Sequence, residues 1–238
     1  MGRNNMKIRY FFDVISPYSC LSWKVLRRYR SIWNMDVELV PVFLGGVMKA
    51  TGNQPPAMLP ARAVMVANDL NRSSLLYNVP LLGTPTDFFS GAARNVIHCQ
   101  RLLVAAQLRN IGGDKVERLV DALTDAIHIN ESFRSDGNNL DINENFLERC
   151  CASAGFDSEL TATLLSDRNT PDVKSGLIAN TEGACEAGMY GSPTMLVYGG
   201  KGDFSEPFLV FGSDRFEQIA FLCEKPWYGP DPSRKSKL

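Results

Sequence analysis

The sequence has no pair of cysteines at CxxC spacing, although six of its 238 residues are cysteines. They are Cys20, Cys99, Cys150, Cys151, Cys185 and Cys223. Histidine is scarce as well, and the two that occur, His98 and His128, stand at no metal-ligand interval. These absences argue against a disulfide-exchange motif and against a metal site. We expect reduced cysteines that pack as small apolar side chains.

The sequence also lacks an excess of charge of either sign. Its 25 basic and 26 acidic residues leave a formal net charge of -1, which favours no nucleic-acid partner. No apolar run approaches the roughly 18 to 20 residues that cross a bilayer, and the amino terminus has no secretory segment. We therefore expect a soluble, intracellular protein without a membrane span.

A composition of 45% hydrophobic and 21% charged residues is ordinary for a globular protein with one core or two closely joined cores. Its first elements form a predicted parallel βαβ unit. The aromatic, β-rich run Ile8–Val14 predicts a buried strand. Apolar side chains then recur every four residues from Leu21 to Trp33, which predicts an amphipathic helix that ends at Asn34. The alternating run Val37–Val42 predicts the second strand.

Strand signals disappear after Leu44 and return at Thr194–Tyr198 and Phe208–Phe211. A closing helix follows, for which Asp214 and Glu217 suggest a capping box. The segment between the strands predicts helices at Ala61–Leu76, Ala92–Leu108, Lys115–Ile129, Asn143–Ala154, Ser158–Leu165 and from Thr170 to about Gly188.

This order predicts an α/β fold that resembles thioredoxin, a βαβ…ββα domain with an all-helical domain inserted in the middle. The expected division is 1–50 with 180–238 for the thioredoxin-like domain and 51–179 for the helical insertion.

Two turns are the most informative part of the chain: Ser16-Pro17-Tyr18-Ser19 at the head of the first helix and Gly191-Ser192-Pro193-Thr194 before the third strand. They resemble the thioredoxin superfamily, in which the first turn carries reactive sulfur and a cis-proline packs against it. Ser16 and Ser19 occupy both positions of the would-be cysteine pair. Taken alone, Ser16 and Pro17 are an ordinary helix cap. Together, the turns predict a protein that binds a thiol supplied from outside rather than exchanging disulfides.

Five motifs in order make the chain resemble the kappa-class glutathione transferases, relatives of the glutathione-dependent 2-hydroxychromene-2-carboxylate isomerase. The motifs are Phe12–Ser19, Gly52–Pro56, Ala67–Leu70, Gly191–Pro193 and Phe211–Arg215.

The resemblance implies glutathione as co-substrate and a homodimer. It implies that Ser16 hydrogen-bonds the glutathione sulfur, that Asn53 contacts the tripeptide, and that the main chain of Ser192 pairs with the cysteinyl moiety. Ser213 and Asp214 would hold the γ-glutamyl end. The remaining predicted binding residues are the turn neighbours Pro17, Tyr18 and Pro193.

Two residues depart from the family pattern. Cys20 stands where tryptophan is usual, and Ser192 stands where a larger apolar residue is common. A thiol in the first helical turn is favoured as a thiolate, and the sequence leaves open whether Cys20 forms a mixed disulfide with glutathione under oxidation. The Ser192 change is expected to be harmless, because the implied contact is made by the main chain.

Three functions remain open on the sequence. The leading one is detoxification by a glutathione transferase, which activates the glutathione thiolate for conjugation to small electrophiles, with reduction of organic peroxides as a further activity. The second is cis-trans isomerisation of the 2-hydroxychromene-2-carboxylate type. The third is a noncatalytic thiol-binding scaffold.

The tripeptide Ser236-Lys237-Leu238 matches the carboxy-terminal address read by the peroxisomal import receptor. Peroxisomal delivery is therefore the leading expectation. The family resemblance leaves the mitochondrion as the alternative.

Overall fold

The computed structural model describes residues 6–234, and the tripeptide Ser236-Lys237-Leu238 lies outside this range. A four-stranded sheet runs through the molecule in the order β2-β1-β3-β4. β1 pairs with β2 in parallel, whereas β3 is antiparallel to both β1 and β4. The strands are β1 (Met6–Phe12), β2 (Met35–Pro41), β3 (Thr194–Tyr198) and β4 (Phe208–Phe211). The predicted thioredoxin-like sheet is thus confirmed, and its first two strands begin two residues earlier than predicted.

Helix α1 (Pro17–Trp33) covers one face of the sheet. The rings of Tyr10 and Phe12 on β1 stack with centroids 5.0 Å apart, and both side chains are buried in the cluster that includes Trp23 of α1. Ser16 caps the helix, and Asn34 ends it in the left-handed conformation with a φ of 48°. The predicted helix and both of its ends are confirmed.

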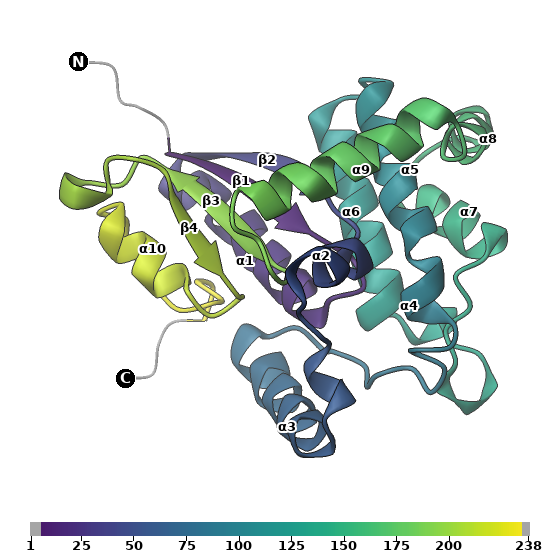
Figure 1. The fold of residues 1–238 in the computed structure, drawn as a ribbon, viewed down its shortest axis with the longest axis horizontal. Helices are drawn as coiled ribbons and strands as arrows, with labels where there is room; N and C mark the ends of the chain where they lie inside the picture. The colour runs from purple at the N-terminus through teal and green to yellow at the C-terminus, as the bar shows by residue number, and fades with distance from the viewer. Residues whose placement is uncertain (1–5, 235–238) are drawn as a thin grey trace.

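The opposite face of the sheet packs against α2 (Leu44–Thr51) and α9 (Pro171–Glu186), which cross the front of the sheet in Figure 1. Phe11 points to this face and joins Val47 of α2 and Ala184 of α9 in a second apolar cluster. Alternation along β1 therefore gives each sheet face its own core.

The insertion between β2 and β3 is helical, as predicted. Its helices besides α2 and α9 are α3 (Pro60–Tyr77), α4 (Ala92–Asn95), α5 (Ile97–Leu108), α6 (Gly113–His128), α7 (Glu144–Ser153) and α8 (Ser158–Asp167). Short 3₁₀ turns occupy Pro56–Met58, Glu131–Phe133, Asp136–Asn138 and, between β3 and β4, Gly202–Phe204. Among residues 6–234 no helix is both long and apolar enough to span a membrane. The bounds 1–50, 51–179 and 180–238 for the two domains stay a prediction.

Two local predictions are wrong. The expected helix Ala92–Leu108 is broken at Val96, where α4 ends and α5 begins. The last helix, α10 (Phe216–Leu222), begins after Arg215 without a side-chain cap. Asp214 instead pairs with Arg215, its Oδ2 lying 2.7 Å from Nη1, so the expected capping box does not form.

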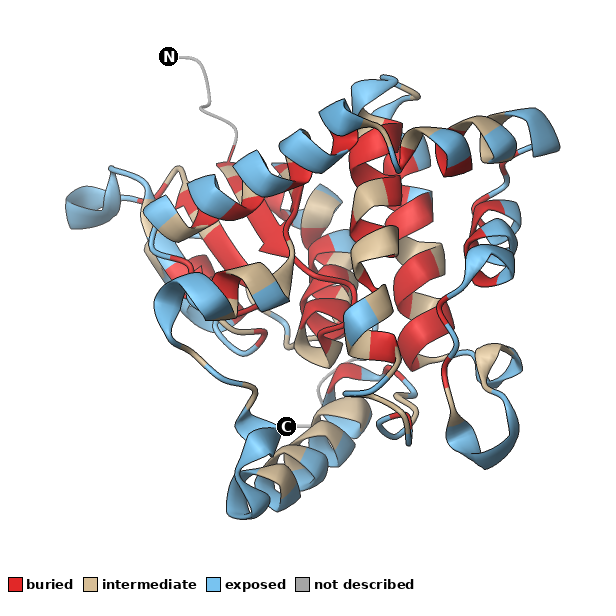
Figure 2. Cartoon of the chain, turned by 45° about the vertical axis from the view of Figure 1, so that its right-hand side comes forward, coloured by how far each residue is buried: buried red, intermediate tan, exposed pale blue. Residues whose placement is uncertain are grey.

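A buried amide joins the helical insertion to the sheet. The Nε2 of Gln100 on α5 donates to the carbonyl oxygens of Phe12 at 2.8 Å and Val42 at 2.7 Å. Gln100 is fully buried, so these bonds lie away from water. α5 therefore fixes the ends of β1 and β2 from which the candidate site is built. α3 lies apart from this core and is mostly exposed or half-exposed in Figure 2.

Candidate functional site

The two predicted turns meet in the structure at Ser16. Its Oγ accepts the N–H of Ser19 at 3.2 Å and donates to the carbonyl oxygen of Ser192 at 3.0 Å. The peptide bond between Ser192 and Pro193 is cis, as predicted. Ser16 is only 6% exposed, so its hydroxyl lies in a largely dry contact between segments 176 residues apart.

Ser19 and Ser192 share a second contact beside Ser16. Their Oγ atoms lie 2.7 Å apart, and Ser192 Oγ also accepts the N–H of Asp13 at 3.0 Å. The hydroxyl of Ser192 thus joins the turn after β1 to the cis-proline loop. A side chain expected only to be harmless at this position therefore has a structural role.

Few donors are left free at the tip of α1. Pro17 has no N–H, Ser16 Oγ accepts the N–H of Ser19, and Ser16 O accepts the N–H of Cys20 at 3.1 Å. The positive end of the helix dipole and the Ser16 hydroxyl, which now donates to Ser192 O, are the features of this tip that suit an anion.

Asp13 is a functional candidate that the sequence did not single out. Its carboxyl group is fully buried and accepts the N–H of Ile15 at 3.1 Å and of Leu44 at 2.8 Å. Burial raises its pKa to about 7, against the lowering effect of these two bonds. Its one sequence signal is an acid at the end of a strand that is otherwise apolar, inside a motif of the family resemblance.

Asn53 lies beside the cis-proline loop and bonds its main chain. Its Nδ2 donates to the carbonyl oxygen of Tyr190 at 2.7 Å, and its Oδ1 accepts the N–H of Gln54 at 2.8 Å. Both ends of the amide are therefore engaged within the protein. A ligand contact by this side chain requires one of these bonds to be exchanged or shared.

The predicted residues Ser213 and Asp214 reach the same loop through their neighbours. The N–H of Gly212 donates to the carbonyl oxygen of Pro193 at 3.0 Å. Tyr77 at the end of α3 donates its hydroxyl to Ser213 O at 2.7 Å, and Ser213 is buried. The turn after β4 is thus held between the cis-proline loop and α3.

Asp69 of α3 adds a carboxylate that the sequence analysis quoted in a motif but assigned no role. Tyr18 donates its hydroxyl to Asp69 Oδ2 at 2.8 Å. The pKa of Tyr18 is raised, first by burial, then by this bond and the charge of Asp69, and further by the charge of Asp214. Asp69 therefore contacts Tyr18 directly and the charge of Asp214 reaches it, so the surroundings of this hydroxyl are negative and suit an ammonium group.

Cys20 does not take part in this site. It is fully buried, and burial raises the pKa of its thiol to about 12. The mixed disulfide with glutathione that the sequence left open is therefore disfavoured, because the Cys20 side chain points into the core. Within residues 6–234, no cluster of three or more His, Cys, Asp or Glu side chains forms that would hold a metal ion.

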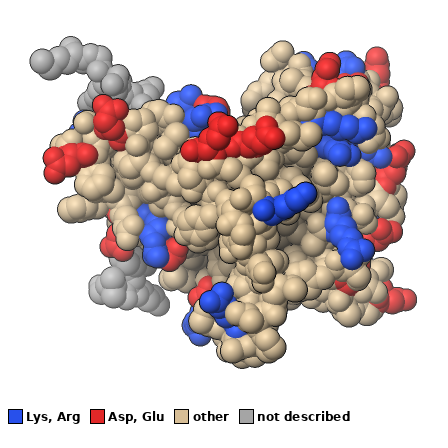
Figure 3. Space-filling view, viewed as in Figure 1, with Lys and Arg blue, Asp and Glu red and all other residues tan. Residues whose placement is uncertain are grey.

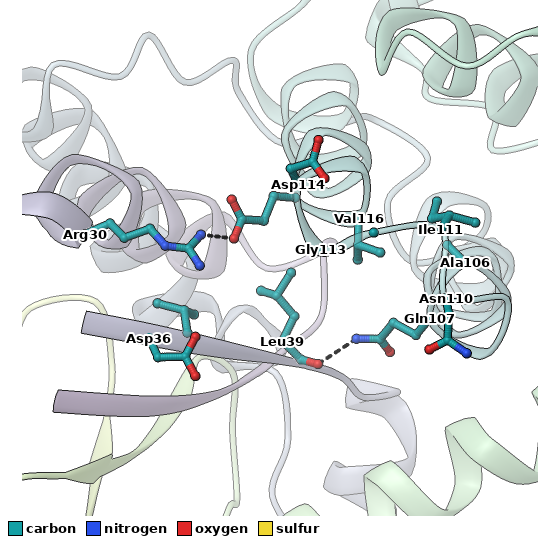
Figure 4. Close-up of a pocket in the computed structure, with 13 residues that line it drawn as sticks. Arg30, Asp36, Leu39, Ala106, Gln107, Asn110, Ile111, Gly113, Asp114 and Val116 are labelled. Atoms are coloured by element: carbon teal, nitrogen blue, oxygen red, sulfur yellow. Dashed lines mark hydrogen bonds and ion pairs between the residues drawn. The ribbon is translucent and has the colours of Figure 1, made fainter. Parts of the chain in front are cut away.

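A cavity of about 570 Å³ lies away from these residues, at the other end of α1 (Figure 4). It is bordered by Arg30, which pairs with Glu117, and by Gln107, whose Nε2 donates to Leu39 O at 2.7 Å. α1 has 17 residues, so this end is roughly 25 Å from Ser16. The cavity is therefore separate from the candidate site.

The site stands on a fold shared with known proteins. Residues 7–222 match the family of DSBA-like thioredoxin domains. The fold is similar to that of 2-hydroxychromene-2-carboxylate isomerase, with a TM-score of 0.69, 19% identity, and coverage of 90% of this chain and 93% of that one. The chain is 32% identical to glutathione S-transferase kappa 1 from Rattus norvegicus and 32% identical to that from Homo sapiens. Both alignments cover 98% of this chain and 97% of the relative. The chain belongs to the DSBA-like thioredoxin family and, within it, to the kappa-class glutathione S-transferases.

Proposed function

We propose that this protein activates the thiol of glutathione at Ser16 and transfers it to small electrophiles, with organic peroxides as further substrates. The observation that carries the proposal is the Ser16 hydroxyl, which caps α1 and lies 3.0 Å from Ser192 O beside the cis-proline. A hydroxyl stands at this helix tip in place of a protein thiol. The named relatives, both glutathione S-transferases, support the same reading.

Ser16 would stabilise the ionised sulfur. When glutathione binds, the Ser16 hydroxyl turns from Ser192 O and donates to the sulfur, where the positive end of the α1 dipole also favours an anion. Ser192 O is then released to pair with the cysteinyl N–H. One exchange of hydrogen bonds therefore binds the ligand and activates its thiol.

Ionisation alone gives a modest rate gain. A thiol with a pKa of about 8.5 is about 3% thiolate at pH 7, and lowering the pKa by about two units raises that fraction about 25-fold. The less basic thiolate is about 8-fold less nucleophilic for a Brønsted slope near 0.45. The net gain in rate from ionisation is therefore only about threefold. Most of the acceleration must therefore come from holding the electrophile beside the sulfur.

The other predicted residues would bind the rest of the tripeptide. Asn53, which bonds Tyr190 O, would contact the tripeptide, and the Ser192 main chain beside the cis-proline would pair with its cysteinyl part. Ser213, Asp214 and Asp69 form the polar end at which an α-amino group finds two carboxylates. The tripeptide would thus lie along the cis-proline loop toward α3.

Two further proposals accompany this function. The enzyme acts as a homodimer, which the exposed apolar side chains of α3 support. Its delivery to peroxisomes rests on Ser236-Lys237-Leu238 alone, outside the described residues. A fluorescent amino-terminal fusion tests delivery, because it should lose its peroxisomal pattern when the tripeptide is removed.

The decisive experiment compares Ser16→Ala with Thr170→Ala, which removes the similar cap of α9 away from the site. Each variant should lose about 1 kcal/mol of stability with its cap. Only Ser16→Ala should raise the pKa of bound glutathione, by about one to two units, because a hydrogen bond to the thiolate is lost. Conjugation to an aryl halide should then fall about twofold to sixfold at pH 6.5, and the difference should shrink at higher pH. An unchanged pH-rate profile in Ser16→Ala would contradict the proposal.

A substrate panel separates the remaining functions. Consumption of an aryl halide or a hydroperoxide with glutathione supports the proposal. Turnover of 2-hydroxychromene-2-carboxylate without net loss of glutathione would assign isomerisation instead. Glutathione binding without turnover of any of these substrates would indicate a noncatalytic scaffold.

A further inference from the structure

A second cavity, of about 720 Å³, opens between α2, α5 and α9 on the face of the sheet opposite α1. Its walls are mainly apolar and include Phe43, Ile97, Leu177 and Ile178. None of its lining residues belongs to the candidate glutathione site. α2 contributes Gly46 and Lys49 to the cavity wall. The same helix also contacts the other site, because the N–H of Leu44 donates to Asp13 near Ser16.

Three cationic side chains, Lys49, Arg101 and Lys174, line this apolar cavity. None of them takes part in an ion pair within residues 6–234. Glu182 and Glu186 of α9 also lie at its wall, so the cavity carries a local excess of one positive charge. On the face shown in Figure 3, acidic and basic side chains are interspersed around a broad uncharged surface. The cavity is therefore distinguished by cations set against apolar walls, not by a strong general field.

Buried nitrogen atoms without hydrogen-bond partners occur on Arg101, which lines the cavity, and on His98 and Arg168, which do not line it. Arg101 Nε is buried and has no hydrogen-bond partner, and the same is true of Nδ1 of His98, one turn earlier on α5. Arg168 is 8% exposed, and its Nε and Nη1 also lack partners, although its Nη2 donates to Glu144 at 2.8 Å. Burial lowers the pKa of His98, and the charges of Arg168 and Arg101 lower it further.

The unpartnered Nε of Arg101 is a buried donor in the cavity wall. Burying a polar group without a hydrogen-bond partner is unfavourable, and burying an unpaired positive charge is more so, which favours a bound acceptor at this wall. A neutral apolar ligand would fill the cavity and leave this cost in place. An anion with an apolar body would satisfy both parts of the wall.

We propose that this cavity is an accessory site, distinct from the glutathione site, for a small apolar carboxylate. Its carboxylate lies on Arg101, with Lys174 and Lys49 at the rim, and its hydrocarbon body packs on Phe43 and Leu177. The proposal does not depend on the transferase function. The shared chemistry is an anionic head on an apolar body, and the probes below distinguish an alkyl body from an aromatic one.

Calorimetry with decanoate and with 2-naphthoate tests the site directly. At least one carboxylate should bind the full-length protein at micromolar to submillimolar concentration, and its neutral counterpart, decan-1-ol or 2-naphthamide, should bind at least tenfold more weakly. Arg101→Gln should weaken carboxylate binding at least tenfold. Arg94→Gln, which changes an exposed arginine that does not line the cavity, should leave it unchanged. The proposal would be overturned if the acid and its neutral analogue bound equally tightly, or if Arg101→Gln and Arg94→Gln bound the carboxylate equally tightly.

Cys185 gives a second readout, because it lines the cavity and is the one cysteine of the six that is not buried. The bound carboxylate should slow alkylation of native protein by N-ethylmaleimide at least fivefold. Cys185→Ser should abolish that labelling and so identify the residue that reacts. Binding without protection of Cys185 would place the ligand elsewhere and overturn the assignment.

Competition shows whether the site is separate. Saturating glutathione should leave the affinity for the carboxylate unchanged, and the carboxylate should not raise the KM for an aryl halide. Competitive inhibition toward the electrophile would assign the cavity to the active site and overturn the accessory role. Because binding and alkylation are measured without turnover, an inactive protein would still give a clear answer here.

Discussion

Nε2 of His128 lies 2.8 Å from the carbonyl oxygen of Val14, two residues before Ser16. His128 ends α6 in the helical insertion and is buried. Burial lowers its pKa to about 4, so at neutral pH the imidazole is uncharged and donates its Nε2 proton to Val14 O. A neutral histidine of the insertion thus holds the segment after β1 that leads into the turn carrying Ser16.

This contact predicts a loss of stability in acid. Between pH 6.5 and about 4, the unfolded chain binds a proton at His128 that the folded chain does not. The free energy of unfolding should therefore fall as the pH is lowered through this window, by up to about 3 kcal/mol, and the contribution should be constant outside it. The free energy of unfolding of His128→Gln, measured with urea, should not show this fall between pH 6.5 and 4. Parallel stability curves for the two proteins from pH 7 to pH 4 would contradict the assignment.

Asp13 predicts the opposite dependence of stability on pH. Its folded pKa of about 7 lies above the ordinary 3.8, so the folded chain keeps a proton that the unfolded chain releases. Its contribution is largest below pH 3.8 and should be lost as the pH rises through 7, by up to about 4 kcal/mol. Asp13→Asn does not titrate, so the stability of the wild type relative to this variant should decrease from pH 4 to pH 7. A constant difference between the two would show that the carboxyl group is ionised when folded.

The two turns and the ends of α1 could be predicted from sequence because their signals are local. Ser16 and Asn34 are residue types that cap helices through their own side-chain or backbone chemistry, and Pro193 precedes a clear strand. The order of strands around a helical segment then indicated the fold. These are properties that a few neighbouring residues determine by themselves.

Elements that depend on tertiary contacts could not be predicted in the same way. α2 contains Gly45 and Gly46 and has no side-chain cap, so its sequence has low helix propensity, and it forms where Val47 packs under α9. Gln100 is a polar residue on a helix with no sequence sign that it would bond two strand ends. The roles of Asp13 and Asp69 likewise depend on segments distant in the chain.

Asp69 and Asp214 should recognise the amino group of glutathione. Both carboxylates influence Tyr18, and an ammonium group between them would form charge-assisted hydrogen bonds. Asp69→Asn should raise the KM for glutathione about 10- to 100-fold with a smaller effect on kcat. Wild type should prefer glutathione to its des-amino analogue, and Asp69→Asn should largely lose that preference. Tyr18→Phe, which keeps both carboxylates, should retain it. An unaltered preference in Asp69→Asn would place the amino group elsewhere.

The surface of α3 should form the contact between two copies of the chain. Apolar side chains more than half exposed gather on and just before this helix: Met58, Leu59, Val64, Met65, Leu75 and Leu76. A patch of this kind is costly in water and marks an interface. Met65→Glu should therefore shift the protein from two chains to one in light scattering after size exclusion. Leu108→Glu, at a similarly exposed apolar site on α5, should not.

Met65→Glu also tests whether dimer formation affects the candidate site. α3 carries Asp69 and Tyr77, and few contacts hold this helix to the rest of its own chain. If a second copy steadies α3, Met65→Glu should raise the KM for glutathione together with the loss of the dimer, and the effect should diminish at high protein concentration. A protein that stays dimeric after Met65→Glu would move the interface to another face. A monomeric variant with unaltered KM would show that α3 holds its position without a partner.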